Sequence, residues 1–187
     1  MAYASWSVSF GEQPSAAKWN ILGTNDAYFD AYIDRAGFPV QIVGNSTSAV
    51  ATGTTTIPVD DTIPQNTEGT EFITQAITPT SATNKLKVTT VIHLSHNTVA
   101  EANLIAAIFQ DSTANALAAG IITSGPAGGV EMLTIEHIMT AGTTSATTFK
   151  VRGGSSSAGT VTNNGGTSAR LFGATSKSAL TVTEYKV

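Results

Sequence analysis

Hydrophobic and polar residues alternate with a period of two along much of this chain. From Leu86 to Leu94, every second residue is hydrophobic, with one Thr among them, and most of the residues between are polar. Such alternation is typical of a β-strand that has one face in a hydrophobic core and the other toward solvent. The same period recurs in residues 130–139, 149–152 and 180–184, which predicts several more half-buried strands.

Residues 104–109, LIAAIF, are hydrophobic at every position, which fits a central strand that is covered on both faces. Clusters of Gly, Pro, Asn, Asp and Ser separate the hydrophobic runs, for example at residues 111–115, 124–129 and 163–166. Many short strands with such turns between them indicate a sandwich or barrel with Greek-key or jelly-roll connections. We therefore predict an all-β fold in which residues 39–187 form a jelly-roll β-sandwich.

Residues 1–38 differ in character, because they hold both tryptophans and most of the tyrosines. Pro14 near a first helical turn and Gly23 as a stop predict one short helix. Thr24 as an N-cap predicts a second helix that runs to about residue 35. Two short helices with so much aromatic surface are unstable alone. The aromatic side chains therefore either fold back onto the sandwich or form an arm that docks on a partner.

Of these two interpretations we favour the docking arm, with one or two short helices, as the N-terminal domain over residues 1–38. The subunits would then associate through the sandwich that follows, which would project away from the partner. The docking residues are predicted to be the apolar side chains Trp6, Phe10, Trp19, Ile21, Leu22 and Phe29.

The composition narrows the classes of partner. Charged residues make up 12% of the chain, the formal net charge is −4, and no cluster of Lys and Arg occurs. A phosphate backbone needs clustered basic side chains, so we expect no nucleic-acid partner. The apolar runs fall far short of the roughly 18 residues that a membrane helix needs, so we expect no membrane partner. The absence of cysteine excludes thiol catalysis, disulfides and thiolate metal sites.

Candidate catalytic and metal-binding residues are few. His93 and His96 differ in parity, so a regular strand would direct them to opposite faces, where they cannot chelate together. Asp60 and Asp61, with Glu68 and Glu71, could in principle supply oxygen ligands to calcium. The favoured interpretation is that these Asp residues form turns, since their spacing matches no known calcium loop.

No catalytic motif stands out in the chain. The sequence contains no nucleophile elbow of the G-x-S-x-G type and no phosphate-binding loop of the Walker type. No pair of acids can be nominated for glycoside hydrolysis, which needs two facing carboxylates. We therefore expect no enzymatic activity and no cofactor.

Several long segments of the sequence resemble small virion modules of tailed bacteriophages and prophages. They are residues 51–71, ATGTTTIPVDDTIPQNTEGTE, residues 77–86, residues 106–119, AAIFQDSTANALAA, and residues 137–153. Residues 10–29, FGEQPSAAKWNILGTNDAYF, resemble the opening of many phage tail and fibre proteins. The resemblance implies a β-sandwich of the trimeric, tumour-necrosis-factor-like jelly-roll kind on the surface of a phage particle.

We therefore expect a structural protein of a tailed-phage particle. It would be a homotrimer docked through its arm on capsid or tail proteins, as a capsid decoration, a head fibre or a short spike. A long fibre does not fit, because residues 37–59 contain no heptads and are the only segment available for a shaft. Three sandwiches could bury apolar strand faces between subunits, and we assign Ile105 and Phe109 to that trimer interface.

Two other functions remain as alternatives. The first is a receptor-binding tail-fibre tip, which would adhere to host surface glycan through loops distant from the arm. The second and least favoured is a depolymerase, because the chain offers no acid pair. The copy number per particle separates decoration from a tail tip, since a decoration protein is present in hundreds of copies and a tip in a few.

Overall fold

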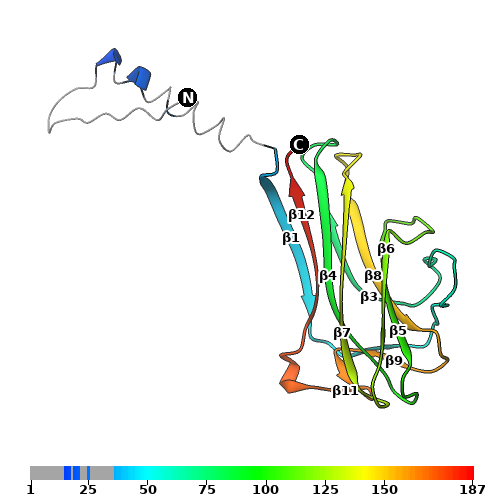
Figure 1. The fold of residues 1–187 in the computed structure, drawn as a ribbon. Helices are drawn as coiled ribbons and strands as arrows, with labels where there is room; N and C mark the ends of the chain where they lie inside the picture. The colour runs from blue at the N-terminus through cyan, green and yellow to red at the C-terminus, as the bar shows by residue number, and fades with distance from the viewer. Residues whose placement is uncertain (1–14, 18, 22–24, 26–35) are drawn as a thin grey trace.

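The computed structural model describes residues 15–17, 19–21, 25 and 36–187, and almost all of the regular structure in them is antiparallel β-sheet (Figure 1). The elements are β1 Pro39–Thr47, β2 Ala51–Gly53, β3 Thr70–Ile77, β4 Lys85–His96, β5 Asn103–Gln110, β6 Ala118–Thr123, β7 Val130–Thr140, β8 Thr147–Ser155, β9 Val161–Asn163, β10 Gly165–Gly166, β11 Ala169–Arg170, the 3-10 helix η1 Phe172–Ala174 and β12 Ser178–Tyr185.

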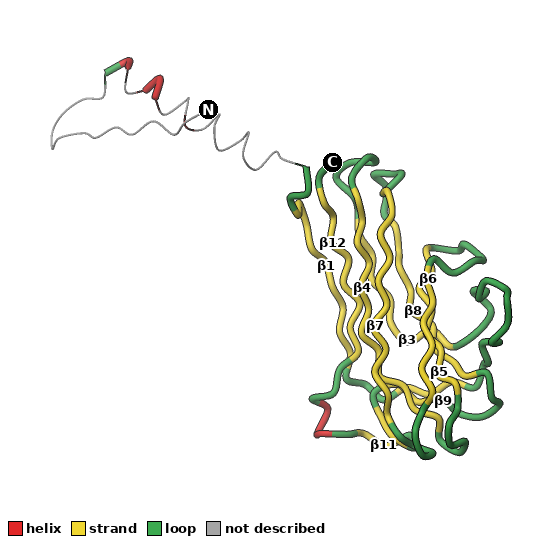
Figure 2. The backbone as a smooth tube through the Cα atoms, in the orientation of Figure 1, coloured by secondary structure: helices red, strands yellow, loops and turns green. Residues whose placement is uncertain are grey.

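The long strands form two sheets that pack face to face, as Figure 2 shows for the backbone. The first sheet has the order β1-β12-β4-β7, and the short strands β9 and β2 extend it beside the end of β4. The second sheet has the order β3-β8-β5-β6. All of these neighbouring strands pair antiparallel.

The connectivity of the sandwich is that of a jelly roll. Strand β1 pairs with β12, β3 with β8, β4 with β7 and β5 with β6, so the pairs are nested within one another along the chain. Successive pairs alternate between the two sheets. Rolling up one long antiparallel hairpin produces this order and yields two Greek keys. The predicted all-β jelly-roll sandwich is therefore confirmed.

The core lies between the sheets and follows the predicted alternation. Leu86, Val88, Ile92 and Leu94 on β4 are fully buried. On β7 the same alternation buries Leu133 and Ile135 and leaves Met132 and Ile138 on the outer face. Strand β5 is buried on both faces over residues 104–109, again as predicted. The inward side chains from both sheets form one hydrophobic cluster.

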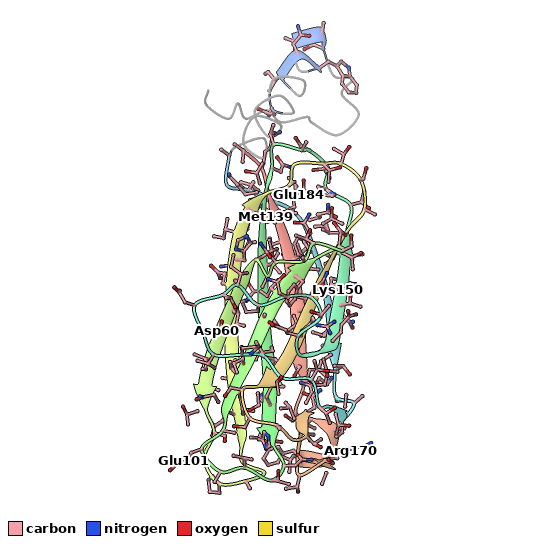
Figure 3. All side chains as sticks on the ribbon, turned by 90° about the vertical axis from the view of Figure 1, so that its right-hand side faces the viewer. Asp60, Glu101, Met139, Lys150, Arg170 and Glu184 are labelled. Atoms are coloured by element: carbon pink, nitrogen blue, oxygen red, sulfur yellow. The ribbon has the colours of Figure 1, made fainter. Side chains whose placement is uncertain are left out.

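Residues 54–69, between β2 and β3, form a loop that covers the outer face of the second sheet. Ile57 of this loop is fully buried, and its backbone N–H donates to the Ser155 carbonyl on β8 over 3.1 Å. A Cβ added to Gly154 would lie 2.9 Å from the Ile57 side chain, so the loop contacts the sheet closely at that glycine. Figure 3 shows the part of the loop around Asp60 crossing the sandwich.

This cover corrects the reason for assigning Ile105 and Phe109 to a trimer interface. The two side chains retain only 5% and 1% of their exposure within a single chain. Ile105 pairs with Gly154, the residue against which Ile57 packs. Burial of this strand face is therefore already explained by the protein's own loop, and no second subunit is needed to account for it.

The two ends of the sandwich differ. The Gly37 N–H donates to the Lys186 carbonyl over 2.7 Å, and the Lys186 N–H donates to the Phe38 carbonyl over 2.8 Å. The start of β1 therefore lies beside the end of β12, as Figure 1 shows. The opposite end, called here the distal end, carries β11 and η1 (Figure 1). At this end Phe172 lies in a 3-10 turn.

Candidate functional site

The outer face of the first sheet carries several exposed apolar side chains. Its outward residues stand in cross-strand rows, which we call together the sheet face. We call the end at which β1 begins the arm end. The row nearest to it that we consider is Ile42, Thr183, Lys87 and Ile138. The following rows toward the distal end are Gly44, Thr181, Thr89 and Glu136, then Ser46, Ala179, Val91 and Thr134, and finally His93 and Met132.

Large apolar side chains border the sheet face, and small ones fill its middle. Ile42, Ile138 and Met132 are 65%, 59% and 57% exposed. Between them lie Gly, Ala, Val and Thr residues, whose short side chains leave the surface flat. Exposed apolar residues gathered on one face typically mark a site of contact with another protein.

The only charges in these rows, Lys87 and Glu136, neutralise each other. The Lys87 Nζ lies 2.6 Å from a Glu136 carboxylate oxygen, and this hydrogen bond raises the pKa of Lys87. Both side chains are partly exposed, so the pair itself adds little to the stability of one chain. The pair therefore leaves these four rows without net charge, whereas the next row toward the start of β1, formed by Tyr185, Lys85 and Thr140, adds the exposed Lys85.

A second apolar surface lies beside the 54–69 loop. A groove of about 250 Å³ separates the loop from β6, and we call it the loop groove. Val59 and Ile121 stand on its two sides with 56% and 53% exposure, and the nearly buried Ile105 also lines it. The other lining residues are Pro58, Asp60, Thr62, Pro64, Ala119 and Gly120.

Three of the four candidate calcium ligands, Asp60, Glu68 and Glu71, have partners other than a metal ion. The Asp60 Oδ1 accepts hydrogen bonds from the Thr62 hydroxyl and backbone N–H, which lower the pKa of Asp60 and close a turn. Glu68 accepts from the Gln65 N–H, and Glu71 lies 3.7 Å from the Lys150 Nζ. Over residues 36–187 and the described residues before them, no three His, Cys, Asp or Glu side chains form a candidate metal site.

The histidines occupy the positions that their parity predicts. His93 lies on the sheet face, where it is partly buried, whereas His96 is fully buried. The His96 Nδ1 accepts the backbone N–H of Val99 over 3.1 Å, so this ring fixes the turn that follows β4. The two rings therefore serve different parts of the fold.

A buried carboxylate that the sequence did not flag fixes the arm end of the sandwich. Glu184 on β12 has no exposed surface. Its carboxylate accepts from Gln41 Nε2 on β1 at 2.6 Å, from Asn84 Nδ2 at 2.6 Å and from the Thr80 N–H at 2.9 Å. The Thr80 hydroxyl at 2.8 Å and the Ser81 N–H at 3.2 Å donate as well. Figure 3 shows Glu184 at this end, near Met139.

The environment of Glu184 favours the charged form. Burial alone would raise the pKa of this carboxyl, but the hydrogen bonds from Gln41, Asn84 and Thr80 outweigh burial and hold the pKa below its usual range. The carboxylate ties β12, β1 and the turn of residues 78–84 together. A signal was available, because Leu180, Val182 and Glu184 share one parity, and the first two are core residues.

The predicted docking residues are only partly within the described chain. Trp19 lies in a helical turn, with its N–H donating to the Ser15 carbonyl over 3.0 Å, and is 59% exposed. Ile21 lies in the same turn and is partly exposed. The remaining four predicted docking residues, Trp6, Phe10, Leu22 and Phe29, lie outside the described residues. Among the described residues, no helix has the length and apolar character needed to span a membrane.

Comparison with known proteins gives no family. No family model matches the chain, and no curated protein matches it. Among solved structures, the C-terminal domain of the sugar-binding protein EclA matches with a TM-score of 0.36 and 16% identity over 66% of this chain and 79% of that one. The VP2 subviral particle of infectious bursal disease virus matches with a TM-score of 0.34 and 11% identity, covering 80% of this chain.

A third match is the enzymatically active domain of tailspike protein 4 of bacteriophage CBA120, with a TM-score of 0.27 and 17% identity over 66% of this chain. The present chain spans 39% of the length of the VP2 protein and 18% of that of the tailspike. At these TM-scores the likenesses assign no function.

Proposed function

We propose that this protein is a structural component of a tailed-phage particle and assembles as a homotrimer. The arm, residues 1–38, docks on a capsid or tail protein, and the jelly-roll sandwich projects outward. The protein acts by assembly and is not an enzyme. The observation that carries this proposal is the sheet face, where Ile42, Ile138 and Met132 stand exposed among rows of mostly small side chains.

The contrast with the second sheet supports assembly through the sheet face. The 54–69 loop covers the outer face of the second sheet, whereas none of the described residues covers the sheet face. The cores of subunit interfaces are enriched in apolar side chains, and the sheet face exposes Ile42, Ile138 and Met132. The assignment to a phage particle rests on the sequence resemblance.

The positions of the chain ends fit the proposed orientation. The backbone enters β1 beside the end of β12, so an arm over residues 1–38 leaves the sandwich at one end. The distal end then points away from the docked particle. Loops there include residues 97–102, 124–129 and 171–177, and they would face the medium.

One observation favours the alternative function, adhesion to host surface glycan. Phe172, in η1 at the distal end, is 79% exposed, and Arg170 beside it is also exposed. Figure 3 shows Arg170 at this end, remote from Glu184. An exposed aromatic ring next to a guanidinium is a suitable surface for stacking on a sugar. Loss of cell binding in the Phe172→Ala variant, with the trimer retained, would favour this second function.

The trimer is tested by sedimentation equilibrium of the 19.2 kDa chain. We expect the wild-type mass to be three times that of the chain. Ile42→Asp should raise the subunit dissociation constant at least tenfold, because it places in the contact a charge whose cross-strand neighbour is the uncharged Thr183. Val187→Asp is the matched control, since Val187 is 62% exposed at the chain end and should not affect assembly. A monomeric wild-type protein would refute the trimer.

The docking arm is tested by deletion. A chain lacking residues 1–36 should fold and form trimers but should no longer join particles. Incorporation of the shortened chain into particles at the wild-type level would contradict the arm's role. Electron microscopy of labelled particles would then distinguish capsid from tail attachment.

A further inference from the structure

We infer that the loop of residues 165–177, at the distal end, binds an acidic sugar that carries a carboxylate or a phosphate group. This inference rests on the second function proposed above, adhesion to host surface glycan, and adds the chemical class of that glycan. Three exposed side chains of the loop carry it, namely the ring of Phe172 and the cations of Arg170 and Lys177. An aromatic ring can stack on a sugar, and cations can pair with its acidic group.

Buried side chains close the loop at its base. Asn164 and Ser178, which flank the loop, are both buried, and the Ser178 hydroxyl donates to the Asn164 Oδ1 over 2.8 Å. The Asn164 Nδ2 donates to the Thr47 carbonyl over 2.8 Å, which ties the same base to the end of β1. Compact surface loops whose ends meet are frequently functional sites. The sandwich therefore fixes the place at which this loop stands.

Further contacts hold the loop between its ends. Gly165 of β10 pairs with Arg170 of β11, and a Cβ at Gly165 would clash with the Ala169 carbonyl. The Asn97 Nδ2 donates to the Ser168 hydroxyl over 2.6 Å. Within η1, the Thr175 hydroxyl donates to the Phe172 carbonyl over 2.7 Å. A loop ordered in this way loses little conformational freedom when it binds a ligand.

The backbone that presents Phe172 is strained. Phe172 has a φ of 48° and Ala174 a φ of 72°, in the left-handed region that residues with a Cβ rarely adopt. Thr167 and Ser168 lie in the same region, with φ of 46° and 65°. The Phe172 ring is nevertheless 79% exposed, so its burial within the chain does not offset this strain. Strained residues cluster at ligand sites, where the strain holds a side chain ready for its ligand.

The loop is a cationic part of an acidic protein. The formal net charge is −4, yet residues 137–183 contain no Asp or Glu. Arg170 and Lys177 are exposed, and neither forms an ion pair with an acidic side chain of the described residues. Figure 3 shows Glu101 at the same end of the sandwich but on the other side from Arg170. The local field therefore favours a negatively charged ligand.

The combination of one ring and two cations favours an acidic sugar over other anions. A guanidinium can donate two parallel hydrogen bonds to a carboxylate or a phosphate. Arg170 and Phe172 are two residues apart, so their Cα atoms lie within about 7 Å of each other and one short oligosaccharide can reach both. A nucleic acid needs a longer row of cations. A single exposed ring offers too little apolar surface to hold the protein on a membrane.

The class of ligand is tested by binding of the full chain to an array of purified bacterial polysaccharides. The array holds members with uronic acids, members with phosphate groups and neutral members, and polyphosphate serves as an anion without a sugar. We expect binding to acidic members, and the two acidic groups show which anion the loop takes. Raising the NaCl concentration from about 50 to about 500 mM should weaken this binding several-fold, because salt screens the charge pairing.

Substitutions in the loop identify the groups that bind. Phe172→Ala should raise the Kd for the best acidic member about tenfold and keep its salt dependence, because the cations remain. Arg170→Gln should raise the Kd about tenfold and reduce the salt dependence. Lys150→Gln, which removes one positive charge from β8, is the matched control for the charge, and Ile121→Ala is the control for the exposed apolar side chain. Both controls should bind like the wild type.

The possible failures are distinguishable. Binding to neutral members alone, equally tight binding to polyphosphate, or equal effects of Arg170→Gln and Lys150→Gln would overturn the acidic-sugar class. Binding to no member would refute adhesion through this loop as well. Sedimentation of the same protein reports on the structural function separately. A trimer that binds no polysaccharide leaves the proposed assembly intact, whereas a monomer that binds acidic members refutes the trimer and supports the acidic-sugar site.

Discussion

The two outer faces of the sandwich differ in whether the described residues of the chain cover them. The face of the second sheet is apolar along β5, and the 54–69 loop covers it, with Ile57 fully buried against Gly154. Along the strands of the first sheet, outward residues alternate with core residues. None of the described residues covers the outward ones, although Ile42 and Ile138 stand exposed among them. The first arrangement completes the fold of one chain. The second leaves a surface that none of the described residues covers.

This difference shows that apolar character alone does not identify an interface. Residues 104–109 are the most hydrophobic run of the chain, yet they belong to the interior of one subunit. The sheet face is only partly apolar, but its exposed Ile and Met residues have no cover within the described chain. What matters for assembly is the apolar surface that remains after the chain has covered what it can.

The largest loss of stability is expected when the loop that covers the second sheet is weakened. Ile57→Ala should destabilise the protein by about 2–5 kcal/mol, because it leaves a cavity between the loop and the sheet. Denaturant unfolding measures the change. Val59→Ala is the matched control in the same loop, and because Val59 is 56% exposed the change should stay within about 0.5 kcal/mol. Equal effects of the two substitutions would mean that the loop is not a structural cover.

Glu184 should stabilise the end of the sandwich at which β1 begins. Glu184→Gln should cost about 2 kcal/mol at pH 7, because the amide cannot accept all the hydrogen bonds that the carboxylate accepts. The pKa of Glu184 in the folded protein is below its usual range. Its ionisation therefore stabilises the fold above the unfolded-state pKa of about 4.3, and this stabilisation is lost as the pH falls through the lower folded-state pKa.

The pH dependence of unfolding provides the readout for this residue. The difference in stability between the wild type and Glu184→Gln should be constant above about pH 5 and should shrink as the pH falls further. Thr183→Ser, a neighbouring change on the sheet face, is the control and should keep the wild-type profile. A difference that does not change with pH would show that the charge of Glu184 is not involved.

The smallest change in stability is expected from breaking the Lys87–Glu136 pair on the sheet face of the single chain. A double-mutant cycle on Lys87 and Glu136, with Ala at each position, should give almost no coupling in dilute protein, because the pair is exposed. At concentrations where subunits assemble, a clear coupling should appear, since the pair is then desolvated. The same small coupling at both concentrations would indicate that the sheet face stays bare.

The sequence predicts the strands well, because burial on one face imposes a period of two. The run from Leu86 to Leu94 predicts β4, and the exposure of Met132 and Ile138 on β7 follows from the same parity. The period does not reveal what lies against each face. It could not show that residues 54–69, which contain strand-forming residues, are a loop that covers β5, because two Ile-Pro steps and long-range contacts decide this.

The sheet face could not be assembled from the sequence, since its rows depend on the register between strands that are distant along the chain. Ile42 and Ile138 share a row only because β1, β12, β4 and β7 pair in that order. Glu184 was missed for another reason. A charged residue at the end of a strand is normally exposed, and only the hydrogen bonds from β1 and the 78–84 turn allow it to be buried.

The pairing of β1 with β12 also determines how the protein responds to mechanical force. A pull on residue 36 along the strand direction acts parallel to β1, so it shears the β1–β12 hydrogen bonds together instead of peeling them apart one by one. The Gln41 and Asn45 amides, which donate to the Thr78 and Thr74 carbonyls, resist the same displacement from the other edge of β1. A sandwich tethered through its first strand is thus held in its mechanically strong direction.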